Sequence, residues 1–471
     1  MQFLKNETAL LFTAHYFSDE FSDDKESEAM KMATAKIYGS RVLELLLRRA
    51  HTLLEYIAFL LGLERVWDHP NESKSSFLTI KSLDENKSHA NVTGFYDSYK
   101  NIITYIFGVG RHDGGTATYV QLDTNTDTLL TASEIKIPYS PKDAPCSTVK
   151  SITYNSRNYF LITGDQGNDG RIADTELWRF EETTHPTFKY ICKFDFNDTR
   201  GSAFIRPSRV FGEKLKQPGT PVILILGATI DFYQADDCNL HSWTKVKSVK
   251  QYSSGKAYRD AALIKDKCCN EYVVVADRSA WNNGRPSGAP VIFIDMSVSN
   301  VDEAITTLEC KCQGVAVADI STIFPGYAYI GNGGEYSIGQ PNFAINVNND
   351  KKFLIPAMHT DHCSAVLVDD PCPTYLDPTC VNHCYSNTAT RAFSVYLKGS
   401  AIHILVVNMG AKQESYVINI HERNDITVTT LKLPDKTDAE SYPIGGDIKM
   451  IGEITYVAIT YYLGETYVYK Y

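Results

Sequence analysis

Residues 454–467 of the chain read ITYVAITYYLGETY, and this stretch decides the fold class. Residues Ile454–Tyr461 form a short run of the alternating, β-prone kind, and a second such run follows Gly464. Together they predict a β-hairpin with glycine at its turn. Short runs of the same kind recur back to about residue 95; examples are Ile103–Val109, Val222–Leu226 and Ile402–Val407. No helical period longer than two turns interrupts them, so residues 95–471 are predicted to be mainly β.

The length of this β region narrows the architecture. About 375 residues of short strands with turn signals suit either a pair of β-sandwiches or a closed β-propeller. A propeller of six blades would use about 63 residues per blade, which leaves room for four strands and their loops. The sequence contains no kelch or WD repeat, so internal repetition does not give the blade number.

Composition excludes several classes of protein. The 471 residues carry 46 Lys and Arg against 56 Asp and Glu, a net charge of −10, with no basic block. Nucleic-acid binding needs clustered cations, so no nucleic-acid partner is expected. No run of 18 apolar residues is present, which excludes a standard membrane helix from this sequence.

Cysteines and glycosylation sequons favour an oxidising, secretory compartment. All 11 cysteines lie between Cys146 and Cys384, and N-x-[ST] sequons stand at Asn6 and at four later positions. A cysteine-rich region beside clustered sequons is typical of secreted proteins. We expect glycosylation at these four later positions, Asn71, Asn86, Asn91 and Asn197.

The N-terminal part differs from the rest of the chain. Residues 1–27 form an acidic segment, residues 28–67 have a helical pattern, and residues 68–94 are interpreted as a glycosylated linker. Leu43, Leu46, Ala50, Leu53, Ile57 and Leu60 recur at steps of three and four, as in an a/d seam. A helix packed on its own domain, an oligomeric stalk and a short membrane anchor all remain open for this segment.

Two local clusters contain side chains that could bind a metal ion. Asp165, Asp169 and Glu176 approach the spacing of a calcium loop, but apparent strands flank them, and a polar turn is the favoured interpretation. Cys372, Cys380 and Cys384 lie within 13 residues of Pro-rich loop, where they suit disulfides better than zinc, because a fourth ligand is missing. No metal and no cofactor is therefore expected.

The cysteine cluster and several other segments together resemble the attachment glycoproteins of paramyxoviruses, the haemagglutinin-neuraminidase, haemagglutinin and henipavirus-type glycoprotein family. The resemblance covers about residues 100–471, and the order of the segments carries it. These segments are Arg111-His-Asp113, Lys142–Ser147, Gly201–Phe211, Asp237-Cys238, Gly339–Phe343, Pro371–Tyr385 and Glu440-Ser-Tyr442.

The resemblance implies a six-bladed β-propeller, preceded by an N-terminal α-helical stalk-like segment. It also implies two disulfides, Cys372–Cys384 and Cys238–Cys380. The family has a membrane span near its N-terminus, and here that span is short or missing.

Whether the chain cleaves sialic acid is the main functional question. Sialidases of this family hold the substrate carboxylate with three arginines, which suits the bidentate geometry of guanidinium. Tyr442 matches the family's tyrosine, and Asp113 is one residue from its aspartate, but the arginines do not carry over. We therefore expect no catalytic residues and take five positions as receptor-facing candidates: Arg111, Asp113, Asn332, Glu335 and Tyr442.

The resemblance implies a viral envelope protein that binds a host cell-surface receptor, either protein or glycan, and supports entry with a separate fusion protein. Copies would associate through residues 43–60, and the head would project from the virion envelope and the infected-cell surface. Two alternatives stay open. One is an active sialidase on the same propeller, and the other is a secreted cellular propeller that acts in adhesion.

Overall fold

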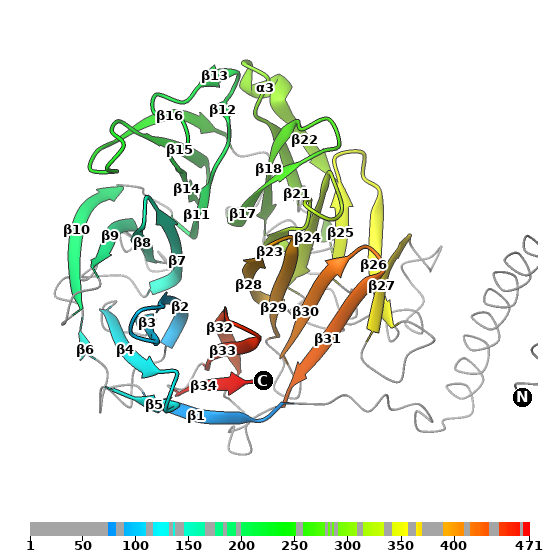
Figure 1. Ribbon diagram of the computed structural model, residues 1–471. Helices are drawn as coiled ribbons and strands as arrows, with labels where there is room; N and C mark the ends of the chain where they lie inside the picture. The colour runs from blue at the N-terminus through cyan, green and yellow to red at the C-terminus, as the bar shows by residue number, and fades with distance from the viewer. Residues whose placement is uncertain are drawn as a thin grey trace, which may run out of the picture. The chain divides into compact units, whose positions relative to one another are not determined.

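The computed structural model describes a large part of residues 74–471, all of it within the unit Pro70–Tyr471 (Figure 1). The described ranges are 74–81, 89–109, 116–130, 135–136, 146–164, 175–181, 186–194, 199–250, 258–277, 281–282, 285–286, 291–308, 314–333, 342–356, 364–369, 390–408, 415–432, 442–461 and 465–471.

The first four blades are antiparallel sheets of consecutive strands. Blade 1 contains β2 (His89–Asp97), β3 (Ile102–Val109), β4 (Thr116–Asp123) and β5 (Thr128–Leu129), with β6 (Ile135–Lys136) also paired to β4. Blade 2 contains β7 (Cys146–Tyr154), β8 (Arg157–Gly164), β9 (Thr175–Glu181) and β10 (Thr187–Phe194). Blade 3 contains β11 (Gly201–Ile205), β14 (Val222–Leu226), β15 (Ile230–Ala235) and β16 (Trp243–Val249), plus the hairpin of β12 (Arg209–Val210) and β13 (Glu213–Lys214). Blade 4 contains β17 (Tyr258–Lys265), β18 (Glu271–Asp277), β21 (Val291–Asp295) and β22 (Ile305–Leu308), with the hairpin of β19 (Trp281–Asn282) and β20 (Arg285–Pro286) and the helix α3 (Val301–Ala304).

Three further blades complete the ring. Blade 5 contains β23 (Gly314–Asp319), β24 (Tyr327–Asn332), β25 (Phe343–Asn346) and β26 (Lys351–Pro356). Blade 6 contains β28 (Thr390–Lys398), β29 (Ala401–Asn408), β30 (Ser415–Glu422) and β31 (Asp425–Leu431), and β27 (Ser364–Asp369) pairs with both β26 and β31. Blade 7 contains β32 (Pro443–Ile451), β33 (Ile454–Tyr461) and β34 (Glu465–Lys470), and its outer strand is β1 (Ser76–Lys81).

The seven innermost strands form a closed ring, as Figure 1 shows. They contact one another in the order β2, β7, β11, β17, β23, β28, β32 and back to β2. β1 pairs with β34 from Ser76↔Tyr469 to Lys81↔Glu465, with a register shift between Ser76 and Leu78, so strands from the two ends of the propeller share one blade. Closure of this kind protects the sheet edges. Of the two architectures that the strand pattern suits, the closed β-propeller is the one observed.

The expected number of six blades is wrong, because the described strands form seven. The innermost strands begin at His89, Cys146, Gly201, Tyr258, Gly314, Thr390 and Pro443, so most blades start 53 to 57 residues apart. This spacing is shorter than the 63 or so residues that six blades would need. In addition, β1 and most of β2 lie within residues 68–94, where a linker was expected.

Helices contribute almost nothing to the described part of the chain. Its one helix is α3, which has four residues and is capped by Asn300. The helical segment expected at residues 28–67, with its seam at 43–60, lies outside the described residues.

Apolar side chains hold each blade to the next. Every residue of the second strand of blade 3, Val222–Leu226, is buried, because neighbouring blades cover both faces of the sheet. The contact between blades 3 and 4 is especially close. A Cβ atom at Gly201 would lie 2.1 Å from the backbone oxygen of Arg259, so only glycine fits at this position.

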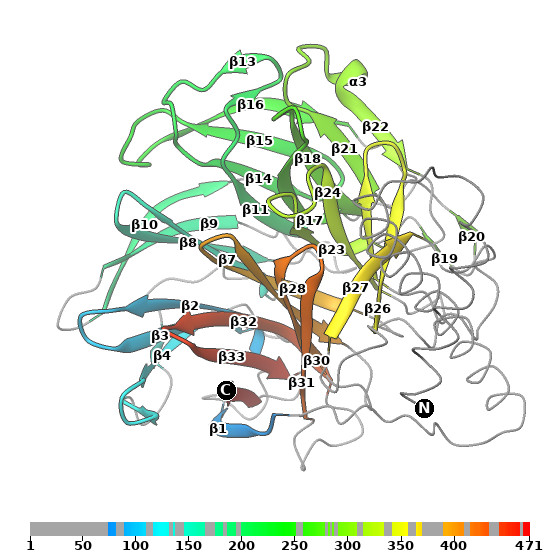
Figure 2. The same ribbon diagram turned by 45° about the vertical axis from the view of Figure 1, so that its right-hand side comes forward.

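The ring has two different faces. Turns between the first and second strands of the blades lie on one face, which we call the turn face; those at 98–101, 155–156, 399–400 and 452–453 are tight. Figure 2 shows the turn between β2 and β3 projecting at the left. The innermost strands begin on the opposite face, which we call the entry face.

Candidate functional site

The strand ends next to all five receptor-facing candidates lie on the entry face of the ring. Asn332 is the last residue of β24, and Tyr442 directly precedes β32. Arg111 and Asp113 fall between the end of β3 and the start of β4, and Glu335 follows β24. Arg111, Asp113 and Glu335 lie outside the described residues, but the strand ends on both sides of them are described. The candidates thus belong to connections of blades 1, 5 and 7 on one face.

Of the two described candidates, Asn332 is the more buried. It is 1% exposed, and its backbone NH donates a hydrogen bond of 2.8 Å to Oδ1 of Asn342. The same Oδ1 accepts a 2.9 Å hydrogen bond from the hydroxyl of Thr390, at the start of β28. Asn342 thus joins blades 5 and 6, and Asn332 packs behind it, whereas Tyr442 is half-buried.

A buried carboxylate at the centre of the ring joins three blades. Asp447 on β32 accepts hydrogen bonds from the backbone NH of Gly94 on β2 at 3.0 Å and from the hydroxyl of Ser394 on β28 at 3.3 Å. Its second neighbour in the chain, Lys449, lies 2.8 Å from the carboxylate. Burial raises the pKa of Asp447 above its ordinary value, although Lys449, Ser394 and Gly94 all act to lower it.

A second carboxylate plays the same part on the other side of the ring. Asp260 on β17 forms an ion pair of 3.0 Å with Lys150 on β7 and accepts a 3.0 Å hydrogen bond from the backbone NH of Val317 on β23. It connects blades 2, 4 and 5. Neither aspartate was predicted from the sequence, although a carboxylate inside a mainly buried strand is a signal that finds such positions.

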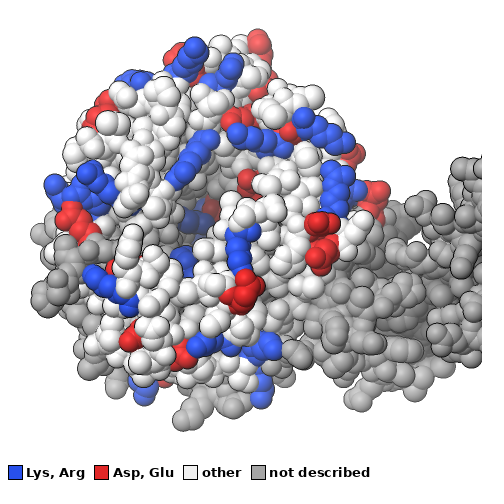
Figure 3. Space-filling model, viewed as in Figure 1, with Lys and Arg blue, Asp and Glu red and all other residues white. Residues whose placement is uncertain are grey.

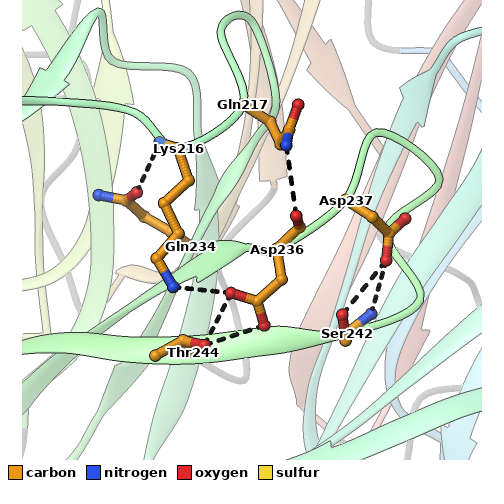
Figure 4. Close-up of polar contacts among 7 residues, drawn as sticks. All are labelled: Lys216, Gln217, Gln234, Asp236, Asp237, Ser242 and Thr244. Carbon is orange, nitrogen blue, oxygen red and sulfur yellow. Dashed lines mark hydrogen bonds and ion pairs between the residues drawn. The ribbon is translucent and has the colours of Figure 1, made fainter.

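On the turn face, polar contacts tie the long connection of blade 3 to the turn between β15 and β16 (Figure 4). Lys216 donates to Oδ1 of Asp236 at 2.8 Å, and Thr244 donates to both carboxylate oxygens of Asp236. The hydrogen bond from Lys216 is the main reason that the pKa of Asp236 lies below its ordinary value. Asp237 accepts hydrogen bonds from the backbone NH and the hydroxyl of Ser242. The network fixes a rigid outer rim for blade 3.

The described residues provide no geometry for a calcium site at Asp165, Asp169 and Glu176. Glu176 is 1% exposed and accepts a 3.0 Å hydrogen bond from the indole NH of Trp178, while Asp165 and Asp169 lie outside the described residues. Within the described ranges, no group of three or more His, Cys, Asp or Glu side chains could hold a metal ion.

The cysteines and sequons fall as follows. Cys238, expected to pair with Cys380, is a free and exposed cysteine; Cys372, Cys380 and Cys384 lie outside the described residues. Asn91 is 8% exposed on β2 and lies against Gly445, which leaves no space for a glycan in the folded head. The remaining expected acceptors, Asn71, Asn86 and Asn197, lie outside the described residues.

A search for membrane-spanning helices among the described residues finds none that is both long and apolar enough.

Comparisons with known proteins add little to this picture. No family model matches the chain, and no curated protein matches it. Among solved structures, the chain is similar to Chaetomium thermophilum Sqt1 bound to the N-terminus of the ribosomal protein L10. The identity is 11%, the match covers 85% of this chain and 100% of that chain, and the TM-score is 0.48. The blade count given above rests on the strand pairing of this chain and not on that likeness.

Proposed function

We propose that the propeller is the receptor-binding head of an attachment protein, and that it holds a cell-surface receptor on its entry face without cleaving it. One observation carries the proposal: the ring topology brings the strand ends next to Arg111, Asp113, Glu335 and Tyr442, in three separate blades, to the same face. Binding residues on loops that a rigid scaffold positions are the usual arrangement in β-folds.

Two buried aspartates support the rigidity that this role needs. Asp447 and Asp260 each accept a backbone NH from the next blade, so the innermost strands are tied together beneath the entry face. A preorganised surface binds a partner with a smaller loss of conformational entropy.

The seven blades change the basis of the proposal. The attachment glycoprotein family that the sequence resembles implies six blades, so the blade number does not support membership of that family. The location on a virion envelope, the fusion-protein partner and the association through residues 43–60 remain parts of the proposal. Deleting residues 1–66 should convert an oligomer into a monomer in light scattering.

The experiment compares one tyrosine on each face of the full chain. Labelled protein is titrated onto cultured animal cells, and binding is read by flow cytometry. Tyr442→Ala should weaken binding by about tenfold, which corresponds to roughly 1.4 kcal/mol. The matched control is Tyr99→Ala, because Tyr99 is 97% exposed on the turn face; it should leave binding unchanged.

Three outcomes would overturn the proposal. The first is an absence of saturable binding, and the second is equal loss of binding in the Tyr442→Ala and Tyr99→Ala variants. The third is turnover of a fluorogenic sialoside that disappears in a Tyr442→Phe variant, which would make the chain a sialidase. Treating the cells with protease or with sialidase before the titration tells a protein receptor from a glycan.

A further inference from the structure

The turn face carries a group of cations on blades 3 and 4 that the proposed receptor site does not use. Residues 199–250, which span blade 3, contain eight Lys and Arg against four Asp and Glu, a local charge of +4 in a chain of net charge −10. Figure 3 shows Lys and Arg side chains gathered on this face, over β12 and β13 and around the central hollow. The basic cluster consists of Arg206, Arg209, Lys214, Lys265 and Lys267.

The hairpin β12–β13 holds part of this cluster rigidly. Phe211 and Gly212, the two residues of its turn, have φ values of 50° and 76°, as a type I′ turn requires. The side chain of Phe211 is fully buried and packs edge-on against Phe232, at 5.2 Å between ring centroids. The backbone NH of Gly212 donates a 2.8 Å hydrogen bond to the oxygen of Met296 in blade 4. The tip of the hairpin is thus anchored, and its polar side chains are left exposed.

Two like charges stand opposite each other on this hairpin. Arg209 pairs with Lys214 across the two strands, and both side chains are exposed. Like charges directly opposite on a sheet are destabilising. Neither cation has a carboxylate partner within the part of the chain that the structure describes. An anion between them would replace repulsion by attraction.

A buried carboxylate brings a third cation to the same place. Glu271 accepts hydrogen bonds from the backbone NH of Ser208 at 2.6 Å and from its hydroxyl at 2.8 Å. The same carboxylate forms a 3.0 Å ion pair with Lys265, whose side chain remains 55% exposed. Because Ser208 directly precedes Arg209, Lys265 is held beside the hairpin.

The two remaining cations extend the cluster. Arg206 donates to the backbone oxygen of Thr153, a neutral acceptor that leaves its charge uncompensated. Lys267 is exposed in the turn after β17. Lys216 belongs to the outer-rim network with Asp236 and is not counted in the cluster.

From these contacts we infer that the basic cluster binds an Asp- and Glu-rich segment of a partner protein, independently of the receptor on the entry face. Arginine holds carboxylates bidentately, and fixed cations at several points along a hairpin suit a run of carboxylates. Nucleic acid fits less well, because the positive charge is confined to two blades and the sequence contains no basic block that could follow a phosphate backbone.

The test measures binding of a fluorescent deca-glutamate peptide to the full chain by fluorescence anisotropy. Binding should be saturable in 50 mM NaCl and should weaken as salt screens the charges. Lys214→Glu should weaken it by about tenfold, which corresponds to roughly 1.4 kcal/mol. Lys250→Glu is the matched control. Lys250 is an exposed lysine directly after β16, at the end of that strand away from the turn face, and its replacement should change the affinity by less than about twofold.

The Arg209→Glu variant shows whether a loss of peptide binding comes from unfolding or from the lost positive charge. This change places an opposite charge across from Lys214, so the melting temperature should stay the same or rise while peptide binding falls. The inference is overturned if the peptide does not bind, or if Lys250→Glu weakens binding as much as Lys214→Glu. It is also overturned if a 20-nucleotide single-stranded DNA binds more tightly than the peptide with the same dependence on Lys214, which would assign the cluster to nucleic acid.

Discussion

Replacing Asp447 by alanine should weaken the closure of the ring. The substitution removes the acceptor for the backbone NH of Gly94, the ion pair with Lys449 and the hydrogen bond from Ser394. A buried NH without an acceptor costs about 1–3 kcal/mol, and breaking a buried ion pair from one side costs about 3–5 kcal/mol in total. We therefore expect a loss of about 4 kcal/mol in the free energy of unfolding.

Thermal unfolding of the full chain, followed by circular dichroism, measures this loss. At about 2.1 cal/mol/K per residue, a head of roughly 400 residues has an unfolding entropy near 0.8 kcal/mol/K, so about 4 kcal/mol lowers the melting temperature by about 5 °C. The control is Asp127→Ala. Asp127 also pairs with a lysine, Lys470, but its side chain is 32% exposed, and the change should cost about 1 kcal/mol or less. Equal melting temperatures for the two variants would refute the role given to Asp447.

The pH dependence of Asp447→Asn gives a separate check. Burial raises the pKa of Asp447 in the folded state above its ordinary value of 3.8, which is the value in the unfolded state. At a pH between the unfolded-state and the folded-state pKa, the folded protein therefore keeps a proton that the unfolded chain has lost. The contribution of Asp447 to stability therefore falls as the pH rises through this window. The asparagine variant cannot titrate, so its melting temperature should rise relative to that of the original protein as the pH increases from 4 to 8.

Three further outcomes are expected. Gly201→Ala should prevent folding of soluble protein, because its Cβ would lie 2.1 Å from the backbone oxygen of Arg259; a soluble variant with an unchanged melting temperature would contradict this. Glu271 has a lowered pKa: burial acts to raise it, but hydrogen bonds from Ser208 and Lys265 outweigh that effect. Its contribution to stability is thus present above its ordinary pKa of 4.5 and is lost as the pH falls through the lowered folded-state pKa. Ser208→Ala removes a hydrogen bond that lowers this pKa, so urea titrations should show a smaller acid loss in the variant. Burial raises the pKa of Cys192 to about 12, so iodoacetamide at pH 8 should label the exposed cysteines of the folded protein long before Cys192, as mass spectrometry can follow.

Local sequence patterns predicted the strands well, because alternation and apolar runs act over a few residues. The runs at Val222–Leu226 and Ile454–Tyr461 coincide with β14 and β33. The blade number could not be predicted in this way. It depends on how sheets pack around a ring, and no motif marks where an innermost strand begins. The first strand and the first six residues of the second also precede residue 95, in a stretch interpreted as a linker.

The candidate site was predicted only in part. Tyr442 and Asn332 were chosen by resemblance, and the structure places both at entry-face ends of strands, with Asn332 buried. Asp447 was not chosen, because its importance comes from Gly94 and Ser394, which lie 353 and 53 residues away in the sequence. Contacts of that kind exist only once the ring is closed.

The pairing of β1 with β34 also bears on how molecules of this protein meet during folding. Ser76 and Tyr469 lie opposite each other although 393 residues separate them, so this pairing must wait for a long loop to close. Until then, β34 presents an open edge that any copy of β1 fits equally well. At high concentration, β1 of one molecule can therefore complete blade 7 of another, and refolding should yield strand-exchanged dimers whose fraction grows with protein concentration.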